Sequence, residues 1–95
     1  MENFDFIFDK MSKNYSELEQ IMSAVYQQTQ NDPTDENSQS LLQGLGNVAK
    51  GIISSQRDFT VAYCDPQTKE VLVASLDEKQ ESLSKALESS KGKTM

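Results

Sequence analysis

The segment RDFTVAYCDPQTKEVLVAS, residues 57–75, decides the fold class of this 95-residue chain. In its first half, large apolar or aromatic residues occupy every second position, which is the period of a half-buried β-strand. These residues are Phe59, Val61 and Tyr63. The second half, EVLVAS, is equally rich in β-branched residues, and Asp65 followed by Pro66 suits the first two positions of a type I turn. The segment therefore predicts a β-hairpin at about residues 59–75, which has to lie on helices or pair with another copy of the chain.

The N-terminal part of the chain carries a long helical pattern. Its apolar residues are spaced alternately by four and three positions, and this helix periodicity is sustained for about three heptads. They are Phe4, Phe8, Met11, Tyr15, Leu18, Met22 and Val25. Asn3 is a suitable N-cap, because its side-chain oxygen can accept a backbone N–H of the first turn. The pattern predicts a coiled-coil-like helix at about residues 4–30, with Phe6 off the apolar stripe and exposed.

A second helix is predicted after the segment TQNDPTDENS. Asp32 can cap this helix, and Pro33 fits its first position, where the missing N–H costs nothing. Asp35 and Glu36 then lie in the first turn, against the positive end of the helix dipole. As far as about Gln56, the apolar residues occupy one arc of the helical wheel. They are Leu41, Leu42, Leu45, Val48, Ala49, Ile52 and Ile53.

A third helix is predicted from the capping box of Ser75 and Glu78, whose side chains can each satisfy a backbone N–H at a helix start. Its narrow apolar stripe consists of Leu76, Leu83, Ala86 and Leu87. Residues 91–95 are small or polar and are expected to be disordered. The predicted fold is α+β and mainly α, with the order helix, helix, β-hairpin, helix in a single domain over residues 1–90.

The stretch LLQGLGNVAKG, residues 41–51, has the glycine spacing of a degenerate dinucleotide-binding fingerprint. That fingerprint needs a strand before its first glycine, and none precedes this stretch, so we expect no nucleotide. Three glycines inside a helix cost about 1 kcal/mol each relative to alanine, which close packing could offset. Gly44, Gly51 and Ser55 lie on one border of the apolar arc and Gly46 on the other. The alternatives are an internal fit against the first helix, contact with a second chain, and a flexible stretch that refolds on assembly.

Composition excludes several kinds of partner. The net charge is −6, and the nine basic residues are scattered, whereas nucleic-acid binding needs them clustered. The longest apolar run is VLVA at residues 71–74, so no membrane span and no signal peptide are expected. A single cysteine, Cys64, rules out an internal disulfide and fits a cytoplasmic protein.

Catalytic and metal-binding patterns are also missing from the sequence. The chain has no histidine, and no motif places a nucleophile beside a base at a known spacing. The acidic residues Asp32, Asp35 and Glu36 lack the glycine and the distal glutamate of a calcium-binding loop. We therefore expect no enzyme activity, no metal and no cofactor.

The remaining function class is binding to other proteins. We expect a non-enzymatic adaptor, assembly factor or chaperone-like accessory protein that forms homo-oligomers or docks on a larger partner. The alternatives are a small acidic inhibitor or immunity-type protein, and a polymerising subunit of a secretion or phage structure. The interface candidates are Phe4, Phe6, Phe8, Met11, Tyr15, Leu18, Met22, Val25, Gly44, Gly51 and Ser55. The apolar seam of the first helix can be internal core or interface.

Overall fold

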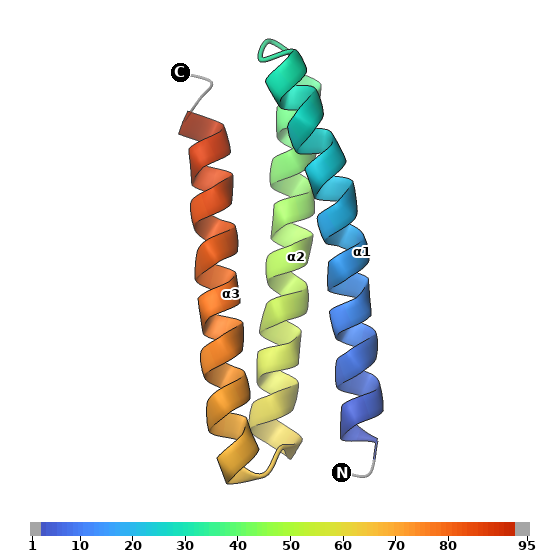
Figure 1. Ribbon diagram of the computed structural model, residues 1–95, viewed down its shortest axis with the longest axis vertical. Helices are drawn as coiled ribbons and strands as arrows, with labels where there is room; N and C mark the ends of the chain where they lie inside the picture. Colours follow the sequence, from blue (N-terminus) through green and yellow to red (C-terminus); the bar gives the residue numbers. More distant parts are fainter. Residues whose placement is uncertain (1–2, 93–95) are drawn as a thin grey trace.

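The protein folds as three α-helices joined by two short loops (Figure 1). A computed structural model describes residues 3–92, together with the side chains as far as Glu88. Helix α1 spans Phe4–Asn31, α2 spans Glu36–Tyr63 and α3 spans Pro66–Gly92. Successive helices run in opposite directions, and no β-strand occurs in this part of the chain. The prediction of a long first helix is confirmed.

Helix α2 lies between α1 and α3 and packs along both of them (Figure 1). The two outer helices contact each other far less than either contacts α2. The molecule measures 48 × 20 × 14 Å, with a radius of gyration of 15.4 Å. A compact domain of this length has a radius of gyration of about 12 Å, so the three helices form an elongated and open arrangement.

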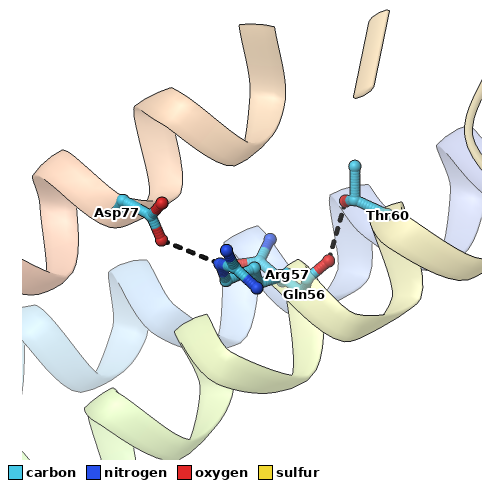
Figure 2. Close-up of polar contacts among 4 residues, drawn as sticks. All are labelled: Gln56, Arg57, Thr60 and Asp77. Atoms are coloured by element: carbon cyan, nitrogen blue, oxygen red, sulfur yellow. Dashed lines mark hydrogen bonds and ion pairs between the residues drawn. The ribbon is translucent and has the colours of Figure 1, made fainter. Parts of the chain in front are cut away.

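The core follows the length of α2 and draws residues from all three helices. Its buried apolar members are Tyr15, Met22, Leu42, Ala49, Ile53, Leu76 and Leu87. Ala49 and Ile53, in the middle of α2, are both 0% exposed. Two polar residues of α2, Gln56 and Thr60, are also completely buried, and Figure 2 shows the Thr60 hydroxyl donating to the backbone carbonyl of Gln56 at 2.7 Å. In the second half of α2, the core therefore continues with these two polar side chains.

The prediction of a β-hairpin at residues 59–75 is wrong, because the described elements are three helices. The predicted α+β fold class is wrong for the same reason. The first half of this segment continues α2, and the second half begins α3. Gln56 and Thr60 lie one helical turn apart and are both buried, and Gln56 Nε2 donates to Ser12 Oγ of α1 at 2.8 Å. Val71, which lies in the second half of the predicted hairpin, is 69% exposed. Local β propensity is weak, and packing against a neighbouring element overrides it here.

The Asp65–Pro66 pair begins α3 instead of turning a hairpin. Asp65 Oδ2 accepts the backbone N–H of Thr68 at 3.0 Å, and Pro66 is the first helical residue. The capping box predicted at Ser75 and Glu78 consequently lies inside α3 and begins no helix.

An ion pair joins the same end of α3 to α2. Arg57 Nε lies 2.9 Å from Asp77 Oδ1 (Figure 2). Both side chains are about half exposed, at 43% and 53%. Exposed pairs of this kind contribute at most about 1 kcal/mol, so this ion pair orients the two helices more than it stabilises them.

The start of α2 and the end of α3 also differ from the prediction. Asp35 is the N-cap of α2 and accepts the backbone N–H of Ser38 at 3.1 Å, whereas Asp32 accepts the backbone N–H of Thr34 in the preceding loop. Helix α2 thus begins later than Pro33 and ends well beyond the predicted boundary. Helix α3 includes the first two residues of the predicted tail 91–95, and residues 93–95 lie outside the described part of the chain.

Acid should weaken both aspartate caps. The pKa of Asp35 is lowered from its ordinary value of 3.8 by the Ser38 hydroxyl and then by the Ser38 N–H. The pKa of Asp65 is lowered by hydrogen bonds from the Thr68 N–H and then its hydroxyl. Because the folded pKa lies below the unfolded one, the stabilisation is complete above the ordinary value and is lost as the pH falls through the folded pKa.

This pH dependence can be measured by thermal melts between pH 7 and pH 2. The control is the double variant Asp35→Asn and Asp65→Asn, because asparagine caps a helix about as well as aspartate but does not titrate. We expect similar melting temperatures at pH 7 and a larger drop for the wild type below about pH 4. Superimposable pH profiles of the two proteins would contradict the assignment of these caps.

The buried amide of Gln56 should make the protein less stable than it could be. Its Oε1 atom is buried and has no hydrogen-bond partner, and an unpaired buried acceptor costs about 1–3 kcal/mol. Gln56→Leu removes the unpaired acceptor without leaving a cavity. We therefore expect the free energy of unfolding to rise by about 1 kcal/mol, even though the bonds from Nε2 to Ser12 Oγ and to the Phe8 carbonyl are lost. Gln56→Ala, which leaves a cavity, should destabilise. Chemical denaturation of both variants tests this, and a destabilised leucine variant contradicts it.

Candidate protein interface

An open groove of about 540 Å³ lies between α1 and α3, and most of the side chains along it are apolar. The wall from α1 consists of Tyr15, Glu19, Met22, Ser23 and Tyr26. The wall from α3 consists of Lys79, Ser82, Leu83, Ala86 and Leu87, and α2 contributes Leu42. Because α1 and α3 make little contact, the groove stays open between them. Of its apolar residues, Tyr15, Met22, Leu42 and Leu87 are buried, whereas Tyr26 and Leu83 are half-buried and Ala86 is exposed.

Tyr15 and Lys79 bridge the groove at one level. The Lys79 Nζ atom of α3 lies 4.0 Å from the centroid of the Tyr15 ring of α1, a cation–π contact. Burial raises the pKa of Tyr15 above its ordinary value of 10.0, and the nearby Glu19 carboxylate adds to this effect. The phenol is therefore neutral at physiological pH.

The predicted apolar seam of α1 serves mainly as internal core. Tyr15 and Met22 are buried and also line the groove. The seam members packed on the core as half-buried side chains are Phe8, Leu18 and Val25, and Met11 is half-buried too. The structure therefore places only part of the seam where a partner can reach it.

Aromatic rings gather where the start of α1 meets the end of α2. The Phe4 ring stacks on Phe59, with centroids 5.0 Å apart and planes 4° from parallel, and on Phe8 at 5.6 Å. Tyr63 continues this cluster and is 55% exposed. Phe6 is 65% exposed, as its position off the stripe predicts. These contacts fasten the N-terminal turns of α1 to α2.

Gly44, Gly51 and Ser55 lie on an exposed face of α2, separate from the groove. Leu41 and Val48 share this face by their spacing and are 53% and 56% exposed. No atom outside the helix backbone lies within 4 Å of the Cβ position at Gly44 or Gly51. These two glycines do not serve an internal fit, and their contact with a second chain stays a prediction.

Gly46 provides the internal fit that the glycine pattern suggested. A Cβ atom added there would overlap the Leu87 side chain, at 2.8 Å from its Cδ2 and 3.1 Å from its Cγ. The close approach is therefore with α3 and not, as predicted, with the first helix. It brings Leu87 into position as part of the groove wall.

Sequence reasoning missed the α3 side of this surface as an interface. One face of α3 shows helical spacing that begins before Ser75, which indicates a helix start upstream of that residue. Its members are Leu72, Leu76, Lys79, Leu83 and Leu87. The hairpin prediction concealed this register, because it assigned Leu72 to a strand. Lys79 and Ala86 therefore received no role as groove residues.

Within residues 3–92, no group of three or more cysteine, aspartate or glutamate side chains is placed to hold a metal ion. None of the helices in the same range has the length and apolar character that crossing a bilayer requires. No family model matches this chain, and no significant match was found among curated proteins or solved structures.

Proposed function

We propose that the protein is a non-enzymatic protein-interaction module whose working surface is the groove between α1 and α3. The observation that carries the proposal is that this groove is open and lined mainly by apolar side chains, of which Leu83 and Ala86 remain accessible to a partner. Burial of apolar surface is the main favourable contribution to protein association. A partner that covers the groove would gain this contribution.

The shape of the groove favours an extended protein segment over a compact ligand. It reaches along α1 from Tyr15 to Tyr26, which is about 16 Å, or three helical turns. Recognition of a helix in an apolar groove is a recurrent mode of protein binding. We propose that the protein acts in the cytoplasm as an adaptor, assembly factor or chaperone-like accessory, and that it forms homo-oligomers or docks on a larger partner.

Two matched variants test the groove as the working surface. Ala86 and Ala24 are both exposed helical alanines, but only Ala86 lines the groove. Ala86→Arg places a long charged side chain in the groove, and Ala24→Arg places the same side chain on a face of α1 outside it. Tagged wild-type protein and both variants are used as bait in host extract, with chemical crosslinking and identification of the crosslinked proteins by mass spectrometry.

We expect Ala86→Arg to lose the partners that the wild type and Ala24→Arg retain, because an arginine in the groove blocks apolar contact and leaves its charge buried. Circular dichroism establishes that all three proteins are equally helical. An identical set of crosslinked partners for all three baits would show that the groove is not the working surface.

A further inference from the structure

We propose that the groove receives an amphipathic α-helix whose apolar stripe is flanked by a basic residue on one side and an acidic residue on the other. This inference rests on the proposed function, since it concerns what the groove binds. Three features of the groove carry it: its backbone surroundings, its length and the opposite charges of its two walls.

The surroundings favour a helix over an extended strand. Residues 4–31 and 66–92 are helical, so the backbone N–H and C=O groups along both walls are already bonded within their own helices. An extended segment in the groove would find few backbone partners, and unpaired buried backbone groups are costly. A helix satisfies its own backbone and presents only side chains to the groove.

The two walls carry opposite charges. Glu19 lines the groove from α1, and Lys79 lines it from α3. Neither side chain forms an ion pair with another side chain that the structure describes, and Lys79 instead lies over the Tyr15 ring. A bound helix would therefore meet the Glu19 carboxylate along the α1 wall and, where Lys79 reaches from α3 across to the Tyr15 ring, an ammonium group. A basic residue facing Glu19 and an acidic residue facing Lys79 complement both charges.

The order of the two flanks decides the direction of the bound helix. Turning the helix end to end exchanges its two flanks, so a given helix with one basic and one acidic flank matches both charges in one direction only, parallel or antiparallel to α1. A helix with two like flanks always places one charge against a like charge. The inference therefore concerns the composition of the flanks and leaves the direction open.

Three synthetic peptides test the inference. They share the same leucine stripe and a length of about four turns, and they differ only in having mixed, all-lysine or all-glutamate flanks. Binding is measured by fluorescence anisotropy at low salt. We expect the wild type to bind the mixed peptide about threefold to tenfold more tightly than either uniform peptide, with a smaller difference at high salt.

Variants of the two walls should change this preference in opposite directions. Glu19→Lys makes both walls basic, so it should prefer the all-glutamate peptide, and Lys79→Glu should prefer the all-lysine peptide. The control is Glu17→Lys, which makes the same change of charge at an exposed α1 position outside the groove. It should keep the preference of the wild type. If a charge reversal unfolds the protein, Glu19→Gln and Lys79→Gln replace it. Glu19→Gln should no longer distinguish the mixed from the all-glutamate peptide, and Lys79→Gln should no longer distinguish the mixed from the all-lysine peptide.

The inference is overturned if the wild type binds none of the peptides, if it binds all three equally, or if the wall variants keep the preference of the wild type. Such a result leaves the proposed function standing, as long as Ala86→Arg loses partners that Ala24→Arg retains. Equal capture by those two baits would remove the proposed function as well.

Discussion

Replacing Ile53 with alanine is expected to lower the free energy of unfolding by about 2–5 kcal/mol. Ile53 is 0% exposed, in the middle of the one helix that packs against both others. The substitution removes buried methyl and methylene groups and leaves a cavity that the neighbouring helices cannot fill completely. Because a domain usually has only about 5–15 kcal/mol of stability, the variant should lose much of it.

The adjacent residue provides the control for this prediction. Ile52 has the same side chain in the same helix but is only half-buried beside the core. Ile52→Ala should therefore cost clearly less than Ile53→Ala. Chemical denaturation followed by circular dichroism measures both losses. Equal losses, or a loss below about 0.5 kcal/mol for Ile53→Ala, would place the centre of the core elsewhere.

The second large effect is expected at Gly46. Gly46→Val should cost about 1–3 kcal/mol, because the added side chain overlaps the end of the Leu87 side chain, and this buried residue or the packing of α2 against α3 must shift to make room. Gly51→Val is the matched control, since nothing lies within 4 Å of a Cβ at Gly51. Valine is a better helix former than glycine, so this control should be as stable as the wild type or slightly more stable.

Thermal melts at several protein concentrations compare these two glycine variants. A melting temperature of Gly46→Val equal to that of Gly51→Val would contradict the close contact with Leu87. Loss of an oligomer in Gly51→Val alone, seen by light scattering, would instead identify the exposed glycine face of α2 as a contact with a second chain.

The first helix could be predicted because its apolar residues keep helical spacing over its whole length, from Phe4 to Val25. The second half of α2 could not, because two of its buried positions are Gln56 and Thr60. Polar residues at interior positions break the apolar period, so the alternation of Phe59, Val61 and Tyr63 suggested a strand. Only packing against α1 decides in favour of the helix.

The two Asp-Pro pairs show a different limit of local reasoning. An aspartate that accepts a nearby backbone N–H and a proline with a fixed φ suit a turn as well as a helix start. The pair at Asp32 was predicted to be a helix start and the pair at Asp65 a turn, and both predictions were wrong. The distinguishing feature is whether the following residues find a packing surface as a helix, which is not a local property.

Only one wall of the candidate site could be predicted from the sequence. Tyr15 and Met22 were candidates from the sequence, and both line the groove. The wall from α3, including Lys79, was not a candidate, because its role depends on the separation of α1 and α3. That separation is a property of the three-dimensional arrangement, and no pattern within one helix encodes it.

The scarcity of contact between α1 and α3 also shapes how the chain folds. Nearly all helix packing joins neighbours in the sequence, α1 with α2 and α2 with α3. Short sequence separations between contacting residues correspond to small loop-closure losses and to folding in microseconds to milliseconds. Each outer helix contacts mainly α2, as the end units of a repeat array contact mainly their neighbours, so we expect either outer helix to detach more readily than the whole molecule unfolds. Helix α2 is therefore the template on which either half of the molecule forms.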